Sequence, residues 1–153
     1  MGLHQDFKDL LSAFDGAKVR YLLVGGYAVS FHSRPRYTKD IDLLIAVEPE
    51  NLRRVQVALA NFGAPGTVMD ALRSLAPGEI LYMGNAPVRV DILQSIPGVE
   101  FEAAFERRIR TEWDGVPVSI LGLEDLIAAK RAAGRPQDLL DAESLERVRR
   151  REP

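Results

Sequence analysis

Two aspartates separated by one residue are the feature of this sequence with the clearest chemical meaning. Asp40 and Asp42 flank Ile41 at the start of the apolar run 43–47. Alternate side chains of a strand share a face, so both carboxylates would lie together while Ile41 faces the core. Carboxylates this close repel each other unless a proton or a cation relieves the repulsion. Because Mg²⁺ prefers one or two carboxylates plus substrate phosphates, the pair predicts a Mg²⁺ or Mn²⁺ site.

A glycine pair precedes these acids. The run 19–24 predicts a buried strand that leads directly into Gly25 and Gly26, and Gly26 lies 14 positions before Asp40. Glycine lets a phosphate approach the backbone, and free N–H groups at a helix start attract anions. A plain turn is the alternative for the glycines alone. Together with the acids, they indicate both halves of a nucleoside triphosphate site.

Asp91 is a third candidate ligand, because it interrupts the apolar strand predicted over 88–93. An unpaired carboxylate there would be costly. A second metal ion in the same site needs such an acid. The alternative is a salt bridge with Arg89, which shares its face by alternation.

These residues resemble the signature of the minimal nucleotidyltransferases of the DNA polymerase β superfamily, most closely the AbiEii-like proteins of toxin–antitoxin and phage-defence loci. The resemblance spans about residues 21–145. The matching positions are Gly25, Gly26, Arg36, Thr38, Asp40, Asp42, Asp91, Lys130, Arg135, Asp138 and Asp141. Two departures stand out: Gly26 replaces a common Ser, and Gln137 replaces a Lys, which removes one hydroxyl and one charge that could contact phosphate or substrate.

The resemblance implies a two-metal reaction that transfers a nucleoside monophosphate from an NTP such as ATP to a hydroxyl. Asp40 and Asp42 would bridge two Mg²⁺ ions, and Asp91 would hold the ion that activates the attacking hydroxyl. The two ions in such sites lie about 3.5–4 Å apart, and the second stabilises the departing pyrophosphate.

Five further positions are candidate site residues, and three of them, Arg36, Thr38 and Asp138, also have a structural interpretation. Arg36 and Thr38 would orient Asp40 or neutralise phosphate charge, or else form an ordinary loop. Lys130 and Arg135 would close over the triphosphate or the acceptor. By resemblance Asp138 would contact the acceptor or accept a proton, whereas a negative charge near a helix start is also a common cap.

Composition narrows the class of protein. The chain has 153 residues, 46% of them hydrophobic and 27% charged, with 20 Lys and Arg against 22 Asp and Glu for a net charge of −2. This is ordinary globular composition, and it gives no overall attraction to nucleic acid. Without cysteine, thiolate chemistry is excluded, and we expect His4 and His32 to have packing or surface roles. Without a charged leader or a long apolar run, we expect a cytoplasmic protein with no membrane contact.

Helical and strand patterns alternate along the chain and predict an α+β fold with a mixed twisted sheet. We expect one nucleotidyltransferase domain over 1–153, with a core over about 19–121 and a pair of C-terminal helices over about 123–150. Helices are predicted over 6–14, 27–31, 49–62, 68–75, 100–108, 123–133 and 137–149. Strands are predicted over 19–24, 41–47, 80–83, 88–93, 110–113 and 116–120. Asp114-Gly115 is the strongest hairpin signal.

Three hypotheses of function follow. The first is a metal-dependent nucleotidyltransferase whose acceptor is RNA or tRNA, a partner protein or a small molecule, possibly within a toxin–antitoxin or defence system. The second is a catalytically weak, antitoxin-like domain that binds a protein, motivated by the departures at Gly26 and Gln137. The third is an Asp-x-Asp glycosyltransferase, although only 39 residues precede Asp40 and such domains generally need more.

Overall fold

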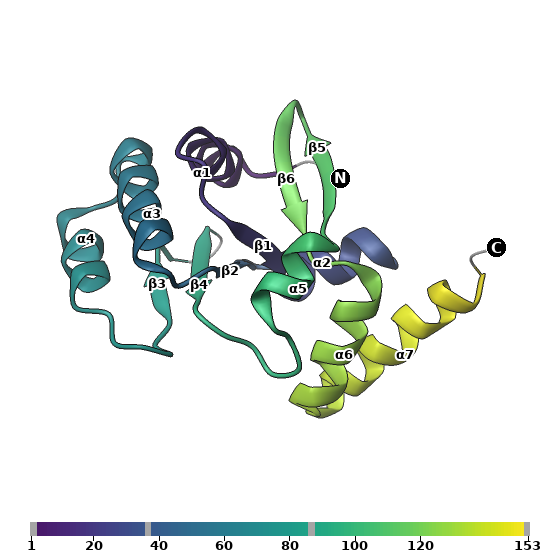
Figure 1. Ribbon diagram of the computed structural model, residues 1–153. Coiled ribbons are helices and arrows are strands. Elements are labelled where there is room, and N and C mark those ends of the chain that lie inside the picture. Colours follow the sequence, from purple (N-terminus) through teal and green to yellow (C-terminus); the bar gives the residue numbers. More distant parts are fainter. Residues whose placement is uncertain (1–2, 36–37, 86–87, 152–153) are drawn as a thin grey trace.

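The computed structural model describes residues 3–35, 38–85 and 88–151, which form one sheet with helices around it (Figure 1). The helices are α1 (Gln5–Gly16), α2 (Gly25–His32), α3 (Pro49–Phe62), α4 (Gly66–Arg73), α5 (Phe101–Glu106), α6 (Leu123–Ala133) and α7 (Pro136–Arg151). The strands are β1 (Tyr21–Val24), β2 (Asp40–Ile45), β3 (Leu81–Met83), β4 (Arg89–Leu93), β5 (Ile109–Trp113) and β6 (Val116–Ile120). Every predicted element is present, with ends displaced by a few residues.

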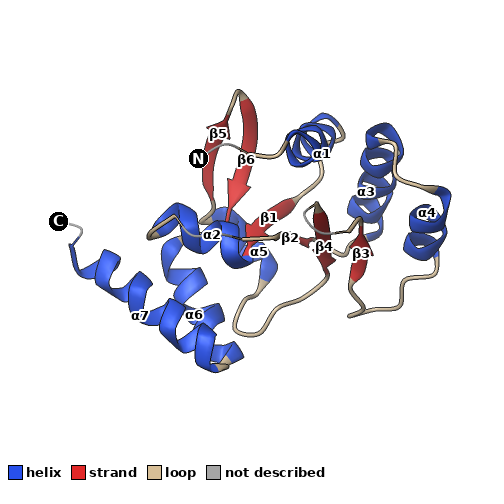
Figure 2. Cartoon of the chain, turned by 180° about the vertical axis from the view of Figure 1, so that it is seen from behind, coloured by secondary structure: helices blue, strands red, loops and turns tan. Residues whose placement is uncertain are grey.

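The sheet is mixed, as predicted. Its strand order is β3-β4-β2-β1-β6-β5. The central strands β1 and β2 are antiparallel, β4 and β6 run parallel to their central neighbours, and β3 and β5 close the edges as antiparallel partners. Helices α3 and α4 lie at one end of the molecule, and the packed pair α6 and α7 lies at the other (Figures 1 and 2).

Local chemistry explains the main boundaries. Asp114 and Gly115 both have positive φ, 51° and 83°, as a two-residue turn between β5 and β6 requires. Helix α3 begins with Pro49 in its first turn and ends at Gly63 in the left-handed conformation. Helix α1 is capped by His4, whose Nδ1 accepts a hydrogen bond from the Asp6 N–H at 3.0 Å.

The core is apolar and continuous between helix α1 and the sheet. Helix α1 buries one stripe of side chains at helical spacing: Phe7, Leu10, Leu11 and Phe14. The central strands supply Leu22, Leu23, Ile41, Leu43 and Leu44. Each such side chain contributes about 1.5–3 kcal/mol when fully buried, so this packing holds the two central strands in register. No helix in the described part of the chain is long and apolar enough to cross a membrane.

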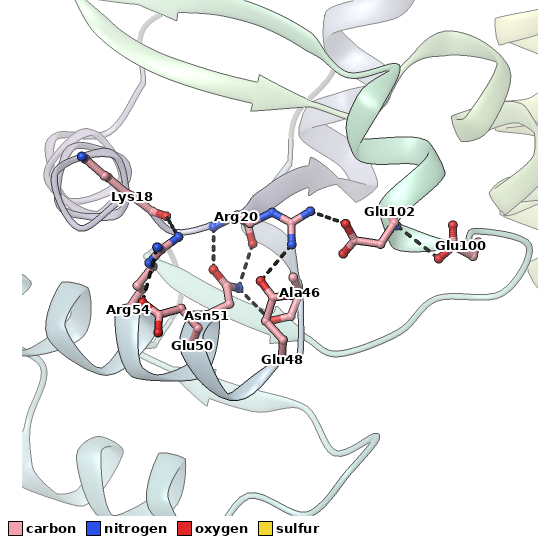
Figure 3. A network of polar contacts seen from close by, with 9 residues as sticks. All are labelled: Lys18, Arg20, Ala46, Glu48, Glu50, Asn51, Arg54, Glu100 and Glu102. Atoms are coloured by element: carbon pink, nitrogen blue, oxygen red, sulfur yellow. Dashed lines mark hydrogen bonds and ion pairs between the residues drawn. The ribbon is translucent and has the colours of Figure 1, made fainter.

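A polar cluster, which we call the Asn51 clasp, fastens one end of the β1–β2 ladder (Figure 3). Asn51 of α3 is fully buried, and its amide bonds the N–H and carbonyl of Arg20 at 2.7 and 3.1 Å and the carbonyl of Ala46 at 2.7 Å. The Arg20 guanidinium pairs with Glu48 at 2.8 Å and with Glu102. Strand β1 continues from this clasp to Gly25, and β2 begins at Asp40, so the predicted site lies at the opposite end of the ladder.

Candidate active site

The sheet register brings the three predicted acids to one place. Asp42 lies opposite Val24 of β1 and opposite Asp91 of β4, so it is flanked on both sides in the sheet. Asp40 shares its face two residues earlier, and all three acids are partly buried while Ile41 is fully buried. The predicted convergence of three acids from two strands is therefore present in the backbone register.

Asp42 has an unusual protonation equilibrium. Burial, followed by the negative charges of Asp91 and Asp40 and a hydrogen bond with Asp91, raises the pKa of Asp42 to about 7, while the charge of Lys130 opposes the shift. A carboxyl group with this pKa is present in both its protonated and its ionised form near neutral pH. The acids are close enough to interact strongly, and a cation between them would relieve the cost.

The position of the Asp42 carboxylate leaves room only for glycine at residue 25. Gly25 has a φ of +68°, and a Cβ built on it would lie only 2.1 Å from Oδ2 of Asp42. The carboxylate thus packs directly on the glycine backbone at the first turn of α2, where helix N–H groups favour negative charge. The carboxylate of Asp42 thus makes a close approach to the backbone of this glycine.

Asp91 lies opposite Asp42 in the sheet and also forms the salt bridge with Arg89 that was the structural alternative. Its carboxylate accepts bonds from Arg89 Nε at 2.9 Å and Nη2 at 3.4 Å, and the Arg89 guanidinium lies 4.8 Å from the centre of the Tyr82 ring. Within the described residues, no three His, Cys, Asp or Glu side chains form a ready set of metal ligands. The donor chemistry suits Mg²⁺ at Asp42 with its neighbours, but Asp91 would first have to exchange Arg89 for a metal ion.

The C-terminal helix pair contributes a second cluster. Lys130 of α6 pairs with Asp138 at 3.3 Å and with Asp141 at 3.1 Å, and both aspartate side chains are almost completely buried. Arg135 in the connection bonds Asp138 through Nε at 2.7 Å and through its own N–H, which lowers the pKa of Asp138. Gln137 donates to Asp141 at 3.0 Å.

A cavity of about 160 Å³ joins the two clusters. Its polar lining comprises Gly25, Asp42, Lys130, Arg135 and Asp138. Leu93, Ile96 and Leu126 line its apolar side. Five of the predicted site residues, from the two ends of the sequence, therefore meet in one place.

The other predicted residues have different positions. Thr38 is half-buried, and its hydroxyl donates to the carbonyl of Asp40 at 3.4 Å, a contact that is compatible with both interpretations of this residue. Arg36 lies outside the described residues. His4 caps α1 and His32 bonds the carbonyl of Leu121 at 2.7 Å, so the expected structural roles are confirmed.

Asp141 is a buried residue of the C-terminal cluster, and the sequence predictions assigned it no role. Its i, i+3 spacing from Asp138 on one helix face was visible in the sequence. What the sequence alone did not reveal is that Lys130 would lie between the two carboxylates. That requires α6 and α7 to fold back on each other.

The sequence matches one family model over residues 1–150, described as "Nucleotidyltransferase of unknown function (DUF6036)". The chain belongs to this nucleotidyltransferase family. No curated protein matches the sequence. The match extends over the sheet, the acids and the C-terminal pair alike.

Solved structures support the nucleotidyltransferase fold. The lincosamide antibiotic adenylyltransferase LnuA, in its lincomycin-bound structure, superposes with a TM-score of 0.59 at 15% identity over 96% of this chain and 98% of that one. The antibiotic-resistance enzyme ANT(2″)-Ia, in complex with adenylyl-2″-tobramycin, gives 0.55 at 15% identity over 94% and 90%. An antigenic nucleotidyltransferase-like protein from Paracoccidioides brasiliensis gives 0.50 at 16% identity over 97% and 79%. At these identities the likeness concerns the fold.

Proposed function

We propose that this protein is a metal-dependent nucleotidyltransferase that transfers a nucleoside monophosphate from an NTP to an acceptor hydroxyl. The observation that carries the proposal is the joining of Gly25, Asp42, Lys130, Arg135 and Asp138 around one cavity, with Asp91 opposite Asp42 in the sheet. Family membership supports the reaction class. The structural neighbours, whose names describe adenylyltransfer to antibiotics, make ATP a reasonable first donor to test.

The residues of the candidate site have three different proposed roles: metal binding, charge neutralisation and orientation of the cations. Asp42, with Asp40 and Asp91, would hold Mg²⁺ or Mn²⁺, which when bound would lower the pKa of the attacking hydroxyl and neutralise charge on the triphosphate. Lys130 and Arg135 would supply positive charge to the triphosphate or the acceptor. Asp138 holds both cations on the cavity wall in this structure. Its proposed role is therefore to orient them, with acceptor contact as the second possibility.

A transfer assay tests the proposal. Purified protein is incubated with Mg²⁺ or Mn²⁺, each α-labelled NTP and a cell extract as the source of acceptors. We expect label to enter an acceptor with the unsubstituted protein and not with Asp42→Asn. The control Asp70→Asn removes a highly exposed carboxylate on α4 that pairs with Arg73, and it should stay active. Absence of transfer by a folded protein with every donor, or full activity of Asp42→Asn, would refute the proposal.

A catalytically weak, antitoxin-like binding domain is the second candidate. It is favoured by the pairing of Asp91 with Arg89 and of Lys130 with two buried aspartates, which occupies groups that a triphosphate site needs free. Membership of the AbiEii-like subgroup, with a toxin–antitoxin or defence setting, is a proposal that is compatible with either candidate. Co-purification of a partner protein without nucleotide transfer would favour this candidate. The glycosyltransferase alternative gains no support from the family match.

A further inference from the structure

A second cavity, which we call the arginine groove, lies away from the candidate active site. It has a volume of about 430 Å³ and is lined by Ser33, Arg34, Ser144, Arg147, Val148 and Arg151. One wall is the segment that follows α2, and the other is the C-terminal half of α7. Three guanidinium groups and two hydroxyl groups thus face one open space, and none of the described residues that line it is acidic.

The pairing of arginines sets this groove apart from the rest of the surface. In the described part of the chain most arginines contact a carboxylate: Arg20, Arg53, Arg54, Arg73, Arg89, Arg107, Arg131, Arg135, Arg149 and Arg150. Within the same residues, Arg34, Arg147 and Arg151 contact none, and Arg147 bonds only Ser144, at 3.3 Å. Arg108 and Arg110 also have no carboxylate partner among the residues that the structure describes, but they do not line this groove.

Helix α7 shows the contrast within a single turn. Arg149 pairs with Glu124 at 2.9 Å and Arg150 with Glu146 at 3.9 Å. Arg147 and Arg151, four residues apart on one face, instead repel each other. The negative end of the helix dipole favours the arginines of the last turn, Arg149, Arg150 and Arg151, whether or not they are paired, so it does not explain why Arg151 lines a cavity without a carboxylate partner among the described residues. An anion between the groove walls would remove the repulsion.

The groove and the candidate active site are connected by the same two helices. Helices α2 and α7 each begin at the active-site cavity, with Gly25 and Asp138, and each leads toward the arginine groove. At a rise of 1.5 Å per residue, Arg147 and Arg151 lie about 14 and 20 Å along α7 from Asp138. This span equals the axial rise of roughly four to six nucleotides of one strand in a B-form duplex, at 3.4 Å each, and of fewer nucleotides in a more extended strand.

We propose that the arginine groove binds the phosphate groups of a polynucleotide strand. Each guanidinium group can make strong, directional bonds to one phosphate. Because the three arginines lie at separate points of an open groove, a row of phosphates can contact all of them, whereas one small anion cannot. Backbone contacts of this kind position a strand without reading its sequence. The identification of that strand as the acceptor of nucleotidyl transfer rests on the proposed function, whereas the binding itself does not.

Binding of a fluorescein-labelled 12-nucleotide RNA, followed by fluorescence anisotropy without NTP, tests the groove. We expect Arg147→Gln/Arg151→Gln to weaken binding at least tenfold and to reduce the salt slope of log K by about 1.4, which is about 0.7 for each lost phosphate contact. The matched control Arg149→Gln/Arg150→Gln removes the same charge from the same helix but from paired arginines, and it should weaken binding less than about twofold. Arg34→Gln tests the opposite wall independently and should weaken binding several-fold.

Three results would overturn the proposal: no saturable RNA binding by the unsubstituted protein, equal losses in the two double variants, or binding of inorganic phosphate as tight as that of the strand. The outcome is separable from that of the transfer assay. RNA bound in the groove without nucleotidyl transfer would leave this site standing while the proposed function fails. Transfer to a small-molecule hydroxyl without RNA binding would support the proposed function and refute the RNA-binding role of the groove.

Discussion

The two ends of the β1–β2 ladder carry polar clusters of opposite character. At the Asn51 clasp, a buried amide makes three backbone hydrogen bonds and one guanidinium faces two carboxylates (Figure 3). At the other end, Asp42 lies beside Asp91 and Asp40, and its pKa is raised to about 7. The clasp is satisfied by the chain itself and supports the fold. The acid cluster, Asp40, Asp42 and Asp91, lowers the free energy of unfolding because its negative charges are crowded and partly buried. Such destabilising groups are typical of functional sites.

The largest effect is expected in the C-terminal cluster, where Lys130 pairs with two buried aspartates beside the acid cluster. Lys130→Met leaves the buried carboxylates of Asp138 and Asp141 without their shared ammonium partner. Because removing one partner of a buried ion pair is costly even where other contacts remain, we expect a loss of about 3–4 kcal/mol in the free energy of unfolding, measured by urea denaturation. Lys8→Met removes an exposed ion pair with Asp114 and should cost below about 1 kcal/mol. Equal losses would mean that the C-terminal cluster is no tighter than a surface pair.

Truncation at the clasp should produce the next largest effect. Asn51→Ala removes the side-chain partner of the Arg20 N–H and of the Ala46 carbonyl, while the Arg20 carbonyl keeps its bond from the Ala46 N–H at 3.2 Å. This loss should cost about 2–3 kcal/mol by the same denaturation assay. Gln94→Ala is the matched control, because the half-buried Gln94 amide also bonds two backbone carbonyls, at 2.8 and 2.9 Å. We expect it to lose about 1 kcal/mol or less. A smaller loss at Asn51 than at Gln94 would contradict the role given to the clasp.

The pH dependence of stability should distinguish the acid cluster from the clasp. Since the pKa of Asp42 is higher in the folded chain than in the unfolded chain, the folded state holds more protons between about pH 4 and pH 7. Stability of the metal-free protein should therefore fall as pH rises through this window. The full shift corresponds to about 4 kcal/mol, and partial access of water reduces our expectation to about 2 kcal/mol.

Asp42→Asn is the control for this pH effect. It should lose most of the decline and differ little from the unsubstituted protein near pH 4, where both side chains are neutral. Urea denaturation at pH 4.5, 6 and 8 measures both proteins. A parallel decline in the two would assign the pH dependence to other groups.

Much of the fold followed from local patterns in the sequence. The stripe Phe7, Leu10, Leu11 and Phe14 predicted α1, and Asp114-Gly115 predicted the hairpin turn, because both signals depend on neighbouring residues. The pairing of Asp40 and Asp42 on one face followed from the period of a strand. These features need no knowledge of how distant segments meet.

Long-range contacts were beyond the sequence patterns. The strand order, with β4 beside β2 and β6 beside β1, is set by packing across the whole chain. The same holds for Lys130 between Asp138 and Asp141, which depends on α6 folding back on α7. At Gly25 the sequence indicated a close backbone approach but not that the carboxylate of Asp42 would make it. The choice between Arg89 and a metal ion as the partner of Asp91 also depends on positions in space.

The most direct test of the account is the stability order of the unsubstituted protein and Asp42→Asn at pH 8, with and without Mg²⁺. Without metal, Asp42→Asn should be the more stable protein, because it removes a crowded negative charge. With Mg²⁺ at 100 times its Kd, the unsubstituted protein should gain about 2.7 kcal/mol and the variant little, so the order reverses. A variant that is less stable in both buffers, or an unsubstituted protein whose unfolding ignores Mg²⁺, would contradict the claim that these acids form a cation site.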